Sequence, residues 1–200
     1  MELRQKLILA SGSPRRVDLL KQAGIDPARL MPMDLDETPK KSEHPRSLAR
    51  RLSADKANAA YQQVRKDLTW GGSYILAADT VVAVGRRILP KTETEAEARA
   101  CLELMSGRRH QVLSSVVLRG PDGALRERLD ETVVSFKRLS TEEITAYLAG
   151  GEWQGKAGGY AIQGAAGAFI PWISGSFTGI VGLPLAETAT LLAAAGYPVW

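Results

Sequence analysis

The sequence predicts an α/β protein whose mixed sheet forms two lobes around a central cleft. Apolar, strand-like runs alternate with amphipathic helical segments in the first half of the chain, and a long β-hairpin follows in the middle. The chain has 200 residues, of which 44% are hydrophobic and 24% are charged, as in a globular protein. We therefore expect a single domain over residues 1–200, with a cleft between its two halves.

The first strand and the first helix meet at a Ser-Gly-Ser-Pro turn. Residues 7–9 are apolar and predict a buried strand, and the turn places Ser13 at the N-cap and Pro14 at the first position of a helix. Such a turn directs free backbone N–H groups and the positive end of a helix dipole at one point, which favours a bound phosphate. Arg15 and Arg16 are unfavourable near that positive end unless an anion lies there. A phosphate site and an ordinary surface turn both fit this local pattern.

The remaining elements follow from periodicity and from turn residues. The patterns predict a short strand at 30–33, a helix at 45–66, and two strands within 73–91 that are separated by a polar interruption at Asp79 and Thr80. A helix at 93–107, a hairpin at 110–139, a helix at 140–151 and a last helix at 184–195 complete the prediction. The hairpin contains a Pro-Asp-Gly turn, and Ser140 and Glu143 have the spacing of a capping box.

Charge and composition limit the classes of function. A formal net charge of +4 and a sequence pI near 9.3 favour an anionic partner such as a nucleotide. The positive charge is spread along the chain and aromatic residues make up only 6%, so we expect no stable complex with nucleic acid. The one cysteine, Cys101, excludes a disulfide within the chain and a Cys-based zinc site. We expect a cytoplasmic protein, because no signal-peptide or membrane-spanning pattern occurs.

A few polar residues stand out from their surroundings. Asp79 interrupts an otherwise apolar stretch, which predicts the rim of a cleft, although a turn aspartate that caps its own backbone also fits. Glu37 belongs to an acidic loop and by itself reads as a solvated side chain, and Lys56 and Lys91 carry no signal alone. Gln163 lies among glycines that permit close approach of the backbone to a ligand, or simply a tight loop.

Several motifs in one order resemble the Maf family of nucleoside triphosphate pyrophosphatases. These motifs are SGSPRR, an acid before a lysine-rich loop, ADT, a lysine after the following strand, and KAGGYAIQG, and the similarity runs from Leu7 to Leu185. The resemblance implies a mixed α/β fold with a deep cleft, like that of inosine triphosphate pyrophosphatases, in a protein that is often dimeric. It also implies hydrolysis of a nucleoside triphosphate between the α and β phosphates, with Mg²⁺ or Mn²⁺.

The resemblance assigns roles to particular residues. Asp79 is expected to be the proton acceptor, and Glu37 and Asp79 are expected to hold the metal. The residues expected to bind substrate or to set specificity are Ser13, Arg15, Lys56, Thr80, Lys91 and Gln163.

Three of these positions separate branches of the family. Arg15, Thr80 and Gln163 resemble the branch that acts on dTTP and UTP, and the same branch suggests modified pyrimidine nucleotides as further substrates. Family members are also associated with nucleotide house-cleaning and with cell-division arrest. Two departures are modest: ILPKT surrounds Lys91 where the family usually has Gly-Lys-Pro, and Gly179 stands where a polar residue is common.

Two other classes of function remain as alternatives. A regulatory protein would keep the nucleotide pocket without turnover, and a nucleic-acid-binding module would use the positive charge without a nucleotide pocket. Asp79 together with both lysines favours turnover over the first alternative.

Overall fold

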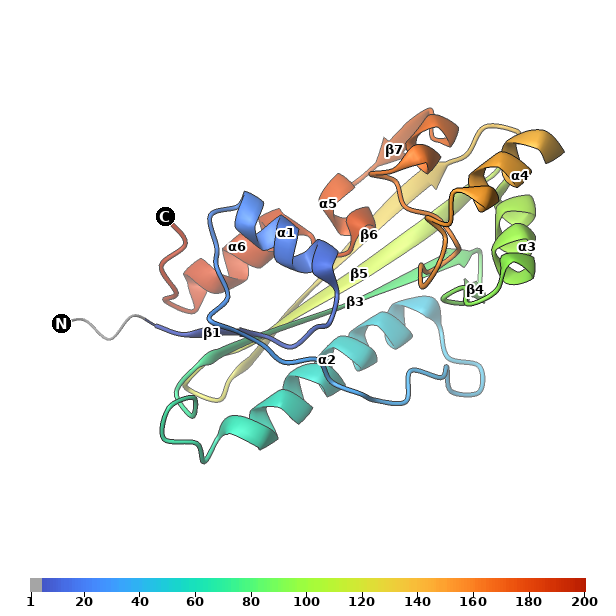
Figure 1. Cartoon of the computed structure of the whole chain (residues 1–200). Helices are drawn as coiled ribbons and strands as arrows, with labels where there is room; N and C mark the ends of the chain where they lie inside the picture. The colour runs from blue at the N-terminus through green and yellow to red at the C-terminus, as the bar shows by residue number, and fades with distance from the viewer. Residues whose placement is uncertain (1–4) are drawn as a thin grey trace.

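The computed structural model describes residues 5–200 and has a seven-stranded mixed sheet at its centre (Figure 1). The strands are β1 (Leu7–Leu9), β2 (Arg29–Leu30), β3 (Tyr74–Val84), β4 (Arg87–Leu89), β5 (Arg109–Arg119), β6 (Leu125–Ser135) and β7 (Trp172–Ser174). The helices are α1 (Pro14–Gln22), α2 (Pro45–Val64), α3 (Glu95–Met105), α4 (Thr141–Ala149), α5 (Phe177–Val181) and α6 (Leu185–Ala194), with a 3-10 turn at Ala165–Phe169. The predicted mixed α/β fold is confirmed.

The order of strands explains the mixed character of the sheet. The path is β2-β1-β3-β5-β6-β7, and β4 forms an additional pair with β3. β1 runs parallel to both β2 and β3, whereas all the other pairs are antiparallel. The 11-residue strands β3, β5 and β6 extend through the whole length of the sheet.

Each face of the sheet is covered by helices. α2 lies along one face of β3 and β5, whereas α5 and α6 pack on the opposite face against β5 and β6 (Figure 1). Neighbouring residues of β1 point to different faces: Leu7 and Leu9 belong to the cluster that includes Leu20 of α1, whereas Ile8 packs with Ala57 of α2. Because both faces are buried there, β1 and most of β3 are apolar rather than alternating, whereas β6 carries many charged and partly exposed residues.

The sheet has a gap along one edge of β3. β1 pairs with β3 from Tyr74 to Leu76, and β4 pairs with the same edge of β3 only from Val82 onward. Within residues 5–200, the stretch 77–81 has a strand partner only on its other edge, where β5 pairs with it. Asp79 and Thr80 lie in this gap, so their neighbourhood is open to a ligand although the strand itself is continuous.

The structure corrects the predicted break at Asp79 and Thr80. The sequence suggested two strands, but β3 is one strand, because Asp79 and Thr80 pair with Ser115 and Ser114 of β5. The polar side chains leave the backbone ladder intact. The predicted short strand at 30–33 is also displaced and shorter, and the glycine-rich segment contains β7 and α5, which the sequence did not predict.

The turn chemistry was predicted more accurately. The hairpin of β5 and β6 forms as expected, and Ser140 and Glu143 complete the expected capping box. Ser13 occupies the N-cap of α1, but its side chain makes no capping hydrogen bond, so the first-turn N–H groups of α1 have no serine cap. No helix within residues 5–200 combines the length and the apolar character needed to cross a membrane.

Candidate active site

Asp79 forms a buried ion pair in the gap of the sheet. The residue is only 3% exposed, and its side chain points to the face covered by α2, where Oδ1 lies 2.5 Å from Nζ of Lys56. Lys56 is itself buried on α2. A carboxylate in this apolar strand therefore has the charged partner that its burial requires.

Glu37 joins the same cluster from a distant loop. Its Oε1 lies 2.5 Å from Nζ of Lys56, and its Oε2 accepts a hydrogen bond from Lys91, which follows β4. Burial acts to raise the pKa of Glu37, but the hydrogen bonds from Lys56 and Lys91 outweigh it, so that the pKa lies below its usual value. The sequence suggested that Glu37 is solvated, and this is wrong: it is half-buried and paired with two ammonium groups.

Thr80 faces the opposite side of the sheet. Its Oγ1 lies 2.9 Å from Oγ of Ser114 and 3.4 Å from a guanidinium nitrogen of Arg16. Arg16 is buried and donates to the carbonyl of Gly182 and to Oγ of Ser11. Burial lowers the pKa of Arg16, and the charge of Asp79 opposes this effect. Within residues 5–200 no carboxylate forms a salt bridge with Arg16, so this buried cation lacks a direct counter-charge.

Three cavities meet around these groups. The first is lined by Ser13, Arg15, Arg16, Asp79, Thr80, Val82, Lys91, Gly155, Lys156, Ala157, Tyr160, Ala161, Gln163, Ile180, Val181 and Gly182. The second is mostly apolar and lies beside α2, where Leu48 and Leu52 line it together with Asp79. The third is bordered by the turn at residues 10–13, by Glu37 and by Lys56. Lys91 borders all three cavities.

The first cavity is strongly cationic. Arg15, Arg16, Lys91 and Lys156 line it, whereas Asp79 is the only carboxylate among the described residues of its lining. Burial lowers the pKa of Arg15, and burial followed by the charge of Arg15 lowers the pKa of Lys156. Cations that are partly stripped of water and repel one another gain from a bound anion.

The segment at 155–163 forms part of the lining of this cavity. It is tied to the chain after β4, because Lys91 and Ala157 form an isolated β-bridge and Gly158 donates to the carbonyl of Pro90. Gly158 and Gly159 have φ values of 69° and 71°, and a Cβ on Gly159 would lie 3.1 Å from Cα of Ala98. Here the glycines of KAGGY serve a tight approach between segments.

The structure brings all of the expected site residues into one region. Ser13, Arg15, Thr80, Lys91 and Gln163 line the first cavity with Asp79, and Glu37 and Lys56 border the third. The first cavity is also lined by Arg16, Lys156 and Tyr160, to which the family motifs assigned no role. The second arginine of SPRR, and the lysine and tyrosine that flank the paired glycines of KAGGY, were the available signals.

The carboxylates fit a divalent cation only in part. Within residues 5–200 no group of three or more His, Cys, Asp or Glu side chains is placed to hold a metal ion. Glu37 and Asp79 nevertheless converge on one ammonium group, that of Lys56. Two carboxylates completed by substrate phosphates and water are a typical Mg²⁺ site, so the donor set fits a cation that arrives with a nucleotide.

Fold and site define an α/β protein with a cation-lined cleft for an anionic ligand. The sequence matches the family described as Maf-like protein over residues 6–195. A dTTP/UTP pyrophosphatase of Rhizobium meliloti (strain 1021) is 64% identical over 199 residues, which cover 100% of this chain and 97% of that protein. One of Brucella abortus (strain 2308) is 60% identical over 200 residues, covering 100% and 96%. The chain belongs to the Maf family.

The similarity to solved structures is more distant. The Ham1 protein of Staphylococcus aureus is 14% identical, with a TM-score of 0.47 over 66% of this chain and 72% of that chain. A HAM1 protein from Coxiella burnetii is 18% identical, with a TM-score of 0.47 over 68% and 74%. Similarity at this level says nothing about substrate.

Proposed function

We propose that this protein hydrolyses dTTP and UTP, and modified pyrimidine nucleotides, between the α and β phosphates. The products are the nucleoside monophosphate and pyrophosphate. The observation that carries the proposal is the clustering of Arg15, Thr80 and Gln163 around Asp79 in one cationic cavity. The names of full-length relatives at 59–64% identity support the same substrates.

The cations of the cleft suit the phosphate chain. A nucleoside triphosphate carries about four negative charges near neutral pH, and removing these charges from water requires positive partners. Arg15 and the ammonium group of Lys91 border the first cavity, and Lys56 borders the third, next to the turn at 10–13 and the N-terminus of α1. We propose that Ser13, Arg15, Lys56 and Lys91 bind the phosphates.

Asp79 is proposed to be the general base. It would take a proton from a water molecule whose oxygen attacks the α-phosphorus, while the bond from that phosphorus to the bridging oxygen breaks and pyrophosphate leaves with the electron pair. The charge pair with Lys56 keeps Asp79 in place before substrate arrives. A divalent cation, Mg²⁺ or Mn²⁺, held by Glu37 and Asp79 would offset the negative charge on the phosphates.

The remaining lining suits a pyrimidine ring. Val82, Ile180 and Val181 give the first cavity an apolar wall, and Gln163 offers both a donor and an acceptor. The carbonyl–NH–carbonyl edge of thymine or uracil matches a carboxamide. We propose that Gln163 reads this edge, with Arg15 and Thr80 setting the position of the nucleotide.

The wider context of the protein stays a prediction. We propose that it acts as a single domain over residues 1–200, as a homodimer in the cytoplasm, without a stable nucleic-acid partner. The role in house-cleaning and the association with cell-division arrest follow from the family resemblance alone.

A substrate screen tests the proposed function. The purified protein is incubated with dTTP, UTP, CTP, ATP and GTP in the presence of Mg²⁺ or Mn²⁺, and pyrophosphate and monophosphate are measured. We expect dTTP and UTP to be the preferred substrates and pyrophosphate, rather than orthophosphate, to be released. Tight binding of dTTP without any product would support a regulatory nucleotide-binding protein instead.

A further inference from the structure

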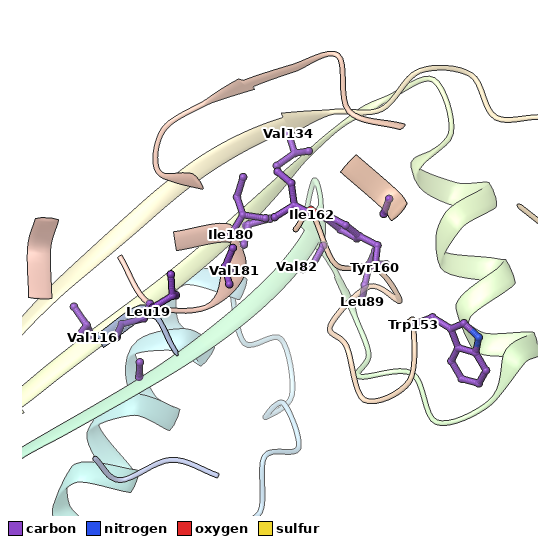
Figure 2. Packing of buried hydrophobic residues seen from close by; sticks show 14 of the residues in the cluster. Leu19, Val82, Leu89, Val116, Val134, Trp153, Tyr160, Ile162, Ile180 and Val181 are labelled. Carbon is purple, nitrogen blue, oxygen red and sulfur yellow. The ribbon is translucent and has the colours of Figure 1, made fainter. Parts of the chain in front are cut away.

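Tyr160 lines the first cavity, and its hydroxyl group is bonded to a buried histidine of the core. The residue is only 6% exposed, and its Oη lies 2.8 Å from Nε2 of His110 on β5. Figure 2 shows Tyr160 close to Val82 and Leu89, which pack under the same segment of chain. Tyr160 therefore borders the cavity, while its hydroxyl group is hydrogen-bonded to His110, which does not line the cavity.

Among the described residues, the side chain of His110 makes its hydrogen bond through Nε2 alone. It is 2% exposed, and within residues 5–200 its Nδ1 has no hydrogen-bond partner. Burial lowers the pKa of His110 to about 4 and raises that of Tyr160, so both groups are neutral near neutral pH. A phenylalanine would fill the same space without an unpaired nitrogen, so the benefit of a histidine here lies in its one bond to Tyr160.

The surrounding rings fix the direction of this bond. His110 meets Phe136 edge to face, with centroids 5.0 Å apart and planes at 84°, and meets Tyr160 in the same way at 5.4 Å and 82°. Phe136 and Tyr160 also meet edge to face, at 5.0 Å. Three mutually packed rings leave Tyr160 little freedom to turn while the hydrogen bond holds.

Tyr160 and Gln163 belong to one short segment that hydrogen bonds hold in place. The N–H of Ala161 donates to Oη of Tyr147 at 3.3 Å, and the N–H of Gly164 donates to the carbonyl of Ala161 at 3.0 Å. Gln163 lies between these two bonds and is itself exposed in the cavity. A shift of Tyr160 therefore displaces the backbone that carries Gln163.

We propose that His110 is a positioning residue for recognition of the base. Through its hydrogen bond to Tyr160 it holds the wall of the first cavity and the backbone of Gln163 in the geometry that accepts a pyrimidine edge. This inference rests on the proposed function. His110 does not touch the nucleotide, and its effect falls on the choice of base rather than on the chemical step.

Three variants test the inference. His110→Phe removes the hydrogen bond and keeps the ring, His110→Gln keeps a polar atom within reach of the tyrosine hydroxyl, and Leu118→Ala creates a cavity at the far end of β5. kcat and KM are measured for dTTP and CTP, together with Tm. A fourth variant, Tyr160→Phe, removes the same hydrogen bond without altering His110.

We expect His110→Phe and Tyr160→Phe to lower the preference for dTTP over CTP about 5- to 10-fold, the effect of one lost hydrogen bond. The change should fall on KM for dTTP, with kcat within about twofold of wild type. His110→Gln should restore most of the preference. Leu118→Ala should lower Tm and leave the preference unchanged. The inference is overturned if His110→Phe or Tyr160→Phe leaves the preference for dTTP over CTP unchanged. It is also overturned if both variants lower kcat/KM equally for dTTP and CTP.

The proposed function is judged separately, on the wild type. If the wild-type protein hydrolyses no pyrimidine triphosphate, the proposed function fails. Dissociation constants for dTTP and CTP, measured on the same variants, then decide the positioning role. An unchanged ratio of the two constants in His110→Phe and Tyr160→Phe would overturn it, whereas a ratio that falls in both and returns in His110→Gln would support it.

Discussion

Asp79 and Thr80 are consecutive in β3, and their side chains point to opposite faces of the sheet. Asp79 contacts Lys56 on the side of α2, and Thr80 contacts Ser114 on the side of α5. Both are reached from the cleft because, among the residues that the structure describes, no strand pairs with the edge of β3 between β1 and β4. One gap in the sheet thus presents a carboxylate and a hydroxyl from both sides of one strand to a single ligand.

The first prediction concerns the proposed general base. Asp79→Asn should fold and lose about 10²–10⁴-fold in kcat, because the amide keeps the shape but accepts no proton and carries no charge for a cation. Turnover of dTTP and Tm are measured together. Near-wild-type turnover would remove Asp79 from the mechanism, and Glu43→Gln, at a carboxylate paired with Arg51 outside the cavities, is the matched control.

The second prediction concerns the shared ammonium group. Lys56→Met leaves the buried Asp79 without its ammonium partner and facing Glu37, which keeps only Lys91, and should lower stability by about 3–5 kcal/mol. Mg²⁺ should raise the Tm of this variant more than that of wild type, because no ammonium group then lies between the two carboxylates that would bind it. Lys91→Met is the control. The side chain of Lys91 is 48% exposed, so its loss should lower stability by less than about 1 kcal/mol. Equal effects of Mg²⁺ on all three proteins would argue against a shared cation site.

The third prediction separates the phosphate site from an ordinary turn. Arg15 donates only to the carbonyl of Val181, at 3.4 Å, and forms no salt bridge within residues 5–200. Arg15→Ala should therefore raise KM for dTTP about tenfold while changing Tm little. KM is measured at low and high ionic strength, and the variant should show a weaker dependence on salt. A lower Tm with an unchanged KM would show that Arg15 only supports the turn.

The fourth prediction concerns the choice of base. Gln163→Glu replaces the amide donor by an oxygen that would face a pyrimidine carbonyl. The lost pairing should cost about 1–3 kcal/mol of binding free energy and lower the preference for dTTP and UTP over CTP and GTP about 10- to 100-fold. Catalytic efficiency is measured on dTTP, UTP, CTP and GTP. An equal decrease on all four substrates would show that Gln163 supports the fold or the phosphate site.

The fifth prediction is a pH dependence of stability. The pKa of His110 falls from about 6.5 in the unfolded chain to about 4 in the fold, so the unfolded state binds the proton first as the pH drops. The stability linked to His110 is complete above about pH 6.5 and decreases by about 3 kcal/mol as the pH falls through about 4.

Carboxylate pairs act mainly at lower pH, which separates the two effects. Glu43, whose hydrogen bonds with Arg51 lower its pKa to about 2, loses its contribution only below its ordinary pKa of 4.5. Urea unfolding of wild type and His110→Phe is compared at about pH 7 and about pH 5, and the loss between them should be smaller in the variant. An identical loss in both proteins would contradict the assignment.

The sequence by itself determined most of the local structure. The capping box of Ser140 with Glu143 and the Pro-Asp-Gly turn act through bonds between near neighbours, so the sequence predicts them without knowledge of the fold. The apolar run at 7–9 predicts a buried strand, although its strand partners are distant in the sequence. The order of motifs likewise indicated the family and the residues of the cleft. The prediction of a break at Asp79 and Thr80 was wrong, because backbone pairing with β5 continues the strand through both residues regardless of the polarity of their side chains.

Only the tertiary structure decided which side chains meet. Glu37 and Lys91 are 54 residues apart, and Asp79 and Lys56 are 23 apart, so neither contact follows from spacing. The hydrogen bond between His110 and Tyr160 spans 50 residues and depends on how β5 packs against the glycine-rich segment. Such contacts form when the burial of two helical layers on one sheet offsets the entropy of closing long loops, and that balance belongs to the whole fold rather than to any local pattern.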